Sequence, residues 1–276
     1  MPELNNFIFS SHNMQEFLDC ERRFELKYLL KQSWPAPQSE PVLEVEKRIR
    51  IGREFHFMIH QYLSGISLSD LLHMNIEPEL KRWLGQFEAF YGNYSFIDHY
   101  SEHSITSPFM DYFLTAVYDF IGLAENSKLI IADWKTSHLP PRKERIEKTV
   151  QSFLYQYLAF ENRQQLFGHT DIGFGDIEMI FWNSIHPNDI VTLPYSEKQH
   201  EKNQESLIQI IEKIISLPMG KFSKTDNLKK CAYCQYRSLC QRGIKAGLYD
   251  QDQDEVLEMD TLISEINFDE SAEIPY

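Results

Sequence analysis

Two aspartates and a lysine lie on either side of one short turn. Asp119 precedes the turn-like segment 124–127, Asp133 and Lys135 follow it, and both flanks have strand-like sequence. If the turn centres on Asn126, paired residues have numbers that sum to 252, which places Asp119 opposite Asp133 with Cβ atoms about 5 Å apart. Two opposed carboxylates repel each other unless a cation lies between them.

This arrangement suits hydrolysis of a phosphodiester. Carboxylates hold Mg²⁺ or Mn²⁺, and such a metal polarises a phosphoryl oxygen and lowers the pKa of a bound water. Lys135 lies two residues after Asp133. It therefore shares the same strand face, where it can orient that water or neutralise developing charge. The alternative is a solvent-exposed hairpin with ordinary surface charges, and a register slip of one or two residues would separate the aspartates.

The four cysteines form a second chemical group. Cys231, Cys234 and Cys240 have the spacing C-x2-C-x5-C, and Cys20 lies about 210 residues earlier. Four thiolates suit either tetrahedral zinc or the four corners of a 4Fe-4S cluster, and the spacing alone favours neither. Either group would crosslink the chain and contribute on the order of 5 kcal/mol by loop closure. We therefore expect the two ends of the chain to meet.

Hydrophobic periodicity gives the elements that must position these residues. Helices are predicted over 11–30, 44–63, 78–91, 142–162 and 196–217, and strands over 104–106, 113–121, 128–134, 173–183 and 190–193. A Ser10-Ser11 start supplies an N-cap for the first helix. The order of helices, strand meander, helix, strands and helix predicts an α/β protein with a central mixed sheet flanked by helices.

Composition indicates a folded globular chain, since 42% of the 276 residues are hydrophobic and 13% are aromatic. These values argue against a disordered or fibrous protein. No apolar run approaches the roughly 20 residues that a membrane helix needs, and the first residues do not resemble a signal peptide. We therefore expect a cytoplasmic protein.

The net charge of −14 at first argues against a nucleic-acid partner, because phosphate binding depends on clustered lysine and arginine. Ten of the acids lie in the segment 250–276, however, and without them the net charge is −4. The body contains basic clusters at 47–53, 142–148 and 221–230. Such clusters are usually solvated surface, but they permit a polyanionic partner.

The acidic segment 250–276 also contains an apolar stripe. Val256, Met259, Ile263 and Ile266 recur at helical spacing among the acids. This pattern predicts a short amphipathic helix after a single domain over 1–249. A tail that is acidic only for solubility is the alternative.

Six motifs occur in one order along residues 11–240. They are Ser11-x5-Phe17-x2-Cys20-x2-Arg23-Phe24-x3-Tyr28-Leu29, Gly52-x3-His56, Asp119, Asp133-Trp134-Lys135-Thr136, Gln151-x3-Tyr155 and the C-x2-C-x5-C trio. Together they resemble the iron–sulfur members of the RecB-like branch of the PD-(D/E)XK nuclease superfamily, which include the AddB nuclease domain and the CRISPR-associated adaptation nuclease. Two positions depart from the usual pattern, Glu21 and Gln235, because many members have proline there.

The resemblance implies a restriction-endonuclease-like core and a set of site residues. It implies that His56, Asp119 and Asp133 bind the metal, with the backbone carbonyl of Trp134 completing the site, and that Lys135 is the catalytic lysine. Gln151 and Tyr155 would line the DNA path. The resemblance favours a 4Fe-4S cluster on Cys20, Cys231, Cys234 and Cys240, which would join the segments 11–30 and 221–243.

The expected function is that of a Mg²⁺- or Mn²⁺-dependent deoxyribonuclease acting on single-stranded DNA or DNA ends, in repair, recombination or CRISPR-type processing. The alternative is a non-catalytic module that uses the same fold to bind DNA or a partner protein. A binding module would have no chemical reason to keep His56, Asp119, Asp133 and Lys135 together. The sequence has no G-x4-G-K-[ST] phosphate loop, so any ATP-driven unwinding would come from a partner such as a helicase.

Overall fold

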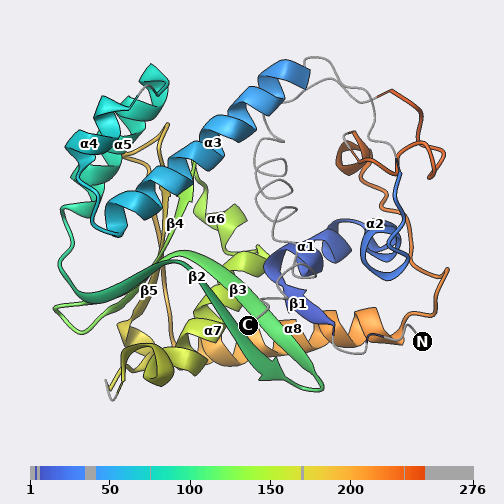
Figure 1. Ribbon diagram of the computed structural model, residues 1–276. Coiled ribbons are helices and arrows are strands. Elements are labelled where there is room, and N and C mark those ends of the chain that lie inside the picture. The colour runs from blue at the N-terminus through green and yellow to red at the C-terminus, as the bar shows by residue number, and fades with distance from the viewer. Residues whose placement is uncertain are drawn as a thin grey trace, which may run out of the picture.

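A six-stranded mixed sheet forms the centre of the computed structural model (Figure 1). The structure describes residue 4 and residues 7–34, 42–74, 76–168, 171–232 and 234–245, with side chains in the helix after residue 41 described from residue 47. The strands are β1 (Ile8–Ser10), β2 (Phe96–Phe109), β3 (Tyr112–Ala124), β4 (Leu129–Lys135), β5 (Ile177–Asn183) and β6 (Val191–Pro194). Their order is β1-β3-β4-β5-β6. Strand β2 lies off this path and pairs with β3.

Helices cover both faces of this sheet (Figure 1). On one face lie α3 (Val42–Leu63), α4 (Leu68–His73) and α5 (Pro78–Tyr91), and on the other lie α1 (Ser11–Asp19), α7 (Val150–Phe167) and α8 (Glu197–Ser216). The remaining short elements are α2 (Glu21–Phe24), α6 (Lys143–Ile146), the π-helical turn Glu25–Leu29 and the 3-10 turns Phe174–Asp176 and Leu228–Cys231. The sequence-based expectation of a mixed sheet flanked by helices is confirmed.

Strand β4 shows how the two cores are separated. Leu129 and Ile131 pack into the core beneath α7 and α8, whereas Ile130, Ala132 and Trp134 pack into the core beneath α3 and α5. Successive side chains of a strand point to opposite faces, so a strand covered on both sides is hydrophobic along its whole length. The polar residues at the end of β4 therefore follow a fully buried strand.

The predicted register of the hairpin between β3 and β4 is confirmed. Pairs run from Leu123 with Leu129 to Phe120 with Ala132, and all of them sum to 252. Ser127 in the turn has a positive φ of 64°. Asp119 and Asp133 are the next residues beyond the last of these pairs.

Several elements differ from the sequence-based expectation. The first helix begins at the predicted cap, Ser10, but ends at Cys20, whose backbone is extended with φ −163° and ψ 104°. The predicted helix over 142–162 is two helices, because Thr149 caps a new helix with its own hydroxyl. The short strand β1 and helix α4 were not predicted. Both are brief, so their stability depends on packing against the rest of the chain rather than on their own periodicity.

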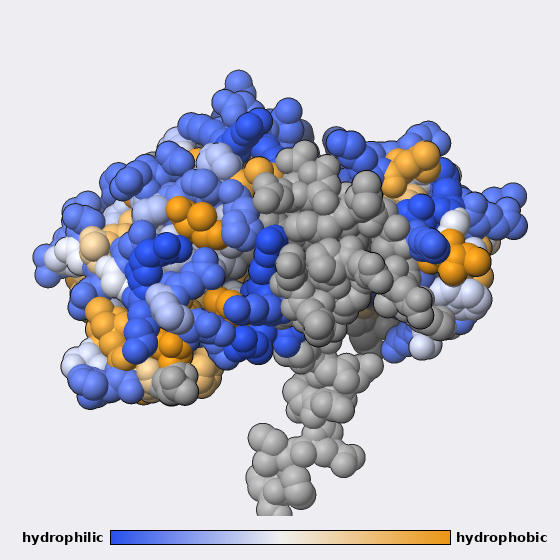
Figure 2. Space-filling view, turned by 90° about the horizontal axis from the view of Figure 1, so that it is seen from above, coloured by the Kyte–Doolittle hydropathy of each residue, from blue (hydrophilic) through white to orange (hydrophobic). Residues whose placement is uncertain are grey.

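The expected approach of the two ends is confirmed for the described residues. Lys230 Nζ lies 3.1 Å from Asp19 Oδ2, and Trp34 Nε1 donates a hydrogen bond of 2.8 Å to Ser238 Oγ. The predicted amphipathic helix over 250–276 lies outside the described residues. Seen from above, the described surface is mostly hydrophilic, with small separate hydrophobic patches (Figure 2). None of the described helices is long and apolar enough to span a bilayer.

Candidate active site

Helix α3 approaches the end of β4 very closely, and Gly52 makes this possible. A Cβ atom at Gly52 would lie 3.0 Å from Thr136 Oγ1, which is tighter than nearly all real contacts. Residues four apart lie on the same face of a helix, so His56 faces the sheet one turn further along. The G-x3-H spacing therefore has a physical cause: the missing side chain brings the imidazole to the edge of the sheet.

His56 lies beside two carboxylates. Its Nδ1 is 3.5 Å from Asp119 Oδ1 and 3.9 Å from Glu102 Oε1. Single ligand atoms of these three residues all lie within 4.8 Å of one another. One imidazole nitrogen and two carboxylate oxygens are suitable ligands for Mn²⁺ or Mg²⁺. The donor set therefore fits the divalent cation that the sequence predicts.

Glu102 was not predicted from the sequence. The hairpin of β2 and β3 turns at Met110 and Asp111, and its pairs sum to 221 on both sides of Glu102, which places Glu102 across from Asp119. Glu102 itself has a φ of 51°. The turn-favouring Asp111 between two strand-like runs was the sequence signal that could have revealed this pairing, but the predicted strand began only at residue 104.

Asp133 lies deeper, with partners of its own. Lys135 Nζ is 2.8 Å from Asp133 Oδ2, and Gln151 Nε2 donates a hydrogen bond of 2.5 Å to Asp133 Oδ1. The backbone N–H of Trp134 donates to Asp119 Oδ2 at 2.8 Å. The predicted site residues are thus brought together, although Asp133 does not belong to the close set that His56, Glu102 and Asp119 form.

The crowded carboxyl groups shift the pKa values of the site residues. Burial lowers the pKa of His56, but the neighbouring carboxylates, Asp119 first, outweigh burial and raise it to about 9. Burial, helped by the charge of Asp119, raises the pKa of Glu102 to about 7. Burial also raises the pKa of Asp133 despite the nearby lysine, whereas His56 overcomes burial and lowers the pKa of Asp119. The upward shifts of the pKa values of His56 and Glu102 share one cause, the negative charge of neighbouring carboxyl groups, and such a concentration of negative charge favours a bound cation.

Tyr155 lies beneath these groups. Its side chain is only 6% exposed, and its ring packs at 4.8 Å on Tyr118. Burial and then the carboxylates of Asp133 and Asp119 raise the pKa of its hydroxyl. Of the two residues expected to line the DNA path, Gln151 contacts the Asp133 carboxylate, whereas Tyr155 is buried in the core and its side chain does not line an open path.

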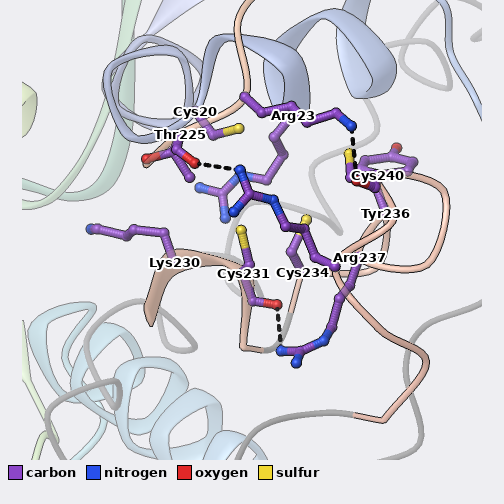
Figure 3. A pocket seen from close by; sticks show the side chains of 11 residues that line it. Cys20, Arg23, Thr225, Lys230, Cys231, Cys234, Tyr236, Arg237 and Cys240 are labelled. Atoms are coloured by element: carbon purple, nitrogen blue, oxygen red, sulfur yellow. Dashed lines mark hydrogen bonds between the residues drawn. The ribbon is translucent and has the colours of Figure 1, made fainter. Parts of the chain in front are cut away.

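The four cysteines line one pocket at the junction of the chain ends (Figure 3). The pocket encloses about 360 Å³ of empty space, open solvent included. Its other lining residues include five basic side chains and no acidic one: Arg23, Lys224, Lys230, Arg237 and Arg242. Burial raises the pKa of the Cys234 thiol to about 11. Among the described residues, however, no three cysteine sulfurs lie within 4.8 Å of one another, so the thiols do not form a closed ligand set.

Arg23 is held in this pocket by a buried acid. Its Nε lies 3.3 Å from Glu16 Oε1, and both side chains are almost fully buried. Lys27 Nζ contacts the same carboxylate oxygen at 3.1 Å. Burial raises the pKa of the Cys234 thiol and outweighs the charge of Arg23, which lowers it, so the net shift is upward.

Comparison with known proteins identifies the family of this chain. A family model described as the PD-(D/E)XK nuclease superfamily matches residues 8–241, which include the residues of the acidic site and the four cysteines. The chain belongs to the PD-(D/E)XK nuclease superfamily. No curated protein matches it.

Two solved structures are similar to this superfamily member. One is "SSO0001", with 15% identity, 87% of each chain covered and a TM-score of 0.36. The other is a "Putative exonuclease" from Eubacterium rectale, with 9% identity, 92% of this chain and 94% of that chain covered and a TM-score of 0.45. Membership in the nuclease superfamily indicates cleavage of a phosphodiester as the class of reaction.

Proposed function

We propose that this protein is a Mg²⁺- or Mn²⁺-dependent deoxyribonuclease that cleaves single-stranded DNA or DNA ends. The observation that carries the proposal is the convergence of His56, Glu102 and Asp119 beside the Asp133–Lys135 ion pair. A non-catalytic DNA-binding module would not need a buried acid paired with a lysine next to a ligand set. We therefore favour the enzyme over the binding module.

The cation would be held by His56, Glu102 and Asp119. The neighbouring Asp133 carboxylate would add negative charge that favours the bound cation. The bound metal would polarise the phosphoryl oxygen and make an attacking water more acidic. Lys135 is held by Asp133, so its ammonium can orient that water or neutralise charge on the phosphate. Gln151 donates a hydrogen bond to the Asp133 carboxylate and so helps to hold the Asp133–Lys135 ion pair in position.

A cleavage assay tests this proposal. Wild-type protein, Asp133→Asn and a matched control, Asp111→Asn in the exposed β2–β3 turn, are incubated with single-stranded, blunt duplex and RNA substrates in Mg²⁺ or Mn²⁺. Asp133→Asn removes the charge while keeping the shape, so cleavage should fall to background, and the control should cut normally. Equal cleavage by both variants would exclude Asp133 from the chemistry, and no metal-dependent cleavage by wild-type protein would favour the binding module.

We also propose that the cysteine pocket holds a 4Fe-4S cluster with a structural role. Four thiolates on one zinc would lie about 3.8 Å apart, because each Zn–S bond is about 2.3 Å. Thiolates of a 4Fe-4S cluster each bind a different iron atom, so four cysteines lining one pocket from both ends of the chain can serve as its four ligands. Anaerobic purification with a visible spectrum and iron and zinc analysis decides between them, since stoichiometric zinc in a colourless protein would overturn the cluster.

Any ATP-driven unwinding of the substrate would be supplied by a separate helicase or another repair or CRISPR protein. A pull-down from the source cell that recovers such a protein with the wild-type chain would support this partner.

A further inference from the structure

A second pocket opens directly beside the acidic site. It lies at the carboxyl ends of β4 and β5, where ligands commonly bind in open α/β sheets. It encloses about 510 Å³ of empty space, open solvent included, and both Lys135 and Gln151 line it. These two side chains contact Asp133 at 2.8 and 2.5 Å. A phosphodiester held at the acidic site would therefore have its adjoining nucleotide within reach of this pocket.

The walls of the pocket are mainly apolar. Leu139, Pro141 and Ile146 come from the segment between β4 and α7, and Phe181 and Trp182 come from the end of β5. Flat apolar groups favour such walls, and every nucleobase has an apolar face that packs in this way.

The polar groups of the pocket are already occupied within the protein. Asn183 Nδ2 donates to the Ser137 carbonyl at 2.9 Å, and its Oδ1 accepts from the backbone N–H of Ile185 at 2.8 Å. Thr149 Oγ1 donates to the Ile146 carbonyl at 2.8 Å. Asn183 and Thr149 therefore have little hydrogen-bonding capacity left to read the edge of a base, and Lys135 and Gln151 face the Asp133 side, so the pocket should accept any of the four bases.

We propose that this pocket binds the nucleobase next to the scissile phosphate and thereby selects unpaired strands. The base-binding role rests on the nuclease function proposed above. A base inserted between Leu139 and the end of β5 cannot remain paired. A duplex would have to extrude that base, which costs a few kcal/mol. The exposed Arg142 and Lys148 lie in the same segment as the wall residues Pro141 and Ile146 and supply positive charge for the neighbouring phosphates.

Cleavage of oligonucleotides with one abasic nucleotide tests the proposal. The abasic position is moved one nucleotide at a time along a labelled single strand, and the rate of each cut is measured in a single turnover with Mn²⁺. For wild-type protein we expect one position, adjacent to the cut bond, at which loss of the base slows cleavage about tenfold or more. The four ordinary bases should be cut there at similar rates.

Two variants locate that effect in the pocket. Leu139→Trp fills the pocket, so it should cut the intact strand more slowly and lose the difference between intact and abasic strands. The matched control, Ile97→Trp at a 65% exposed position on β2, should keep the wild-type profile. If Leu139→Trp does not fold, Leu139→Ala takes its place in the test. It removes wall contacts without adding bulk, so it should reduce the difference in cleavage rate between intact and abasic strands. Mn²⁺ affinity should be unchanged in all three.

The results separate the two proposals. Cleavage by wild-type protein with a flat abasic profile, or an unchanged profile in Leu139→Trp, would overturn the base pocket and leave the nuclease standing. No metal-dependent cleavage of the intact strand would overturn the nuclease and the base pocket with it.

Discussion

Gly52→Ala is the most informative single change, because two effects of known size oppose each other there. In an ordinary helix, replacing glycine with alanine stabilises a protein by about 1 kcal/mol. At Gly52 the new Cβ would lie 3.0 Å from Thr136 Oγ1. Overpacking of this kind costs about 1–3 kcal/mol. The net free energy of unfolding should therefore be unchanged or lower by up to about 2 kcal/mol.

Gly85 provides a matched control on α5. It also lies inside a helix, but a Cβ there would have no atom within 4 Å. Gly85→Ala should therefore stabilise the protein by about 1 kcal/mol, so the two substitutions should differ by roughly 1–3 kcal/mol. Urea unfolding of the protein without added metal measures both changes, provided that the slope of the transition stays constant.

A double-mutant cycle tests the contact between a Cβ at position 52 and Thr136 Oγ1. Thr136→Ala removes the oxygen that the new methyl group meets, so Gly52→Ala should cost at least about 1 kcal/mol less in that background. Because α3 also carries His56, Gly52→Ala alone should weaken Mn²⁺ binding, and the second substitution should restore part of it. If Gly52→Ala were as stabilising as Gly85→Ala and bound Mn²⁺ normally, close packing of α3 would not be what places His56.

Further predictions concern the metal and the thiols. Lys135→Ala should reduce cleavage by at least about 100-fold with little loss of Mn²⁺ affinity, and unchanged turnover in the assay would remove the lysine from the chemistry. Glu102→Gln should weaken Mn²⁺ binding about 10- to 100-fold in calorimetric titration, against no change for Asp111→Asn. Since the pKa of His56 is about 9, binding must release its proton, and affinity should rise about tenfold per pH unit towards pH 9; a flat profile from pH 7 to 9 would contradict this. Cys240→Ser should lose the visible absorbance and lower the thermal midpoint, and a stable coloured variant would exclude this thiol as a ligand.

The sequence determined the features that depend on neighbours along the chain. The hairpin register that brings Asp119 next to Asp133 follows from a short turn and alternating side chains. The start of the first helix at Ser10 follows from a local cap. Each is fixed by hydrogen bonds within a few residues, which is why composition and spacing were sufficient to predict them.

Tertiary structure alone decided which side chains complete the site. Glu102 joins His56 only because the turn at Met110 aligns two long strands and α3 packs on their far end. The pocket beside Lys135 requires the segment after β4 to fold back against the end of β5. These contacts join residues that are distant in sequence, and their free energy comes from packing that no local pattern records.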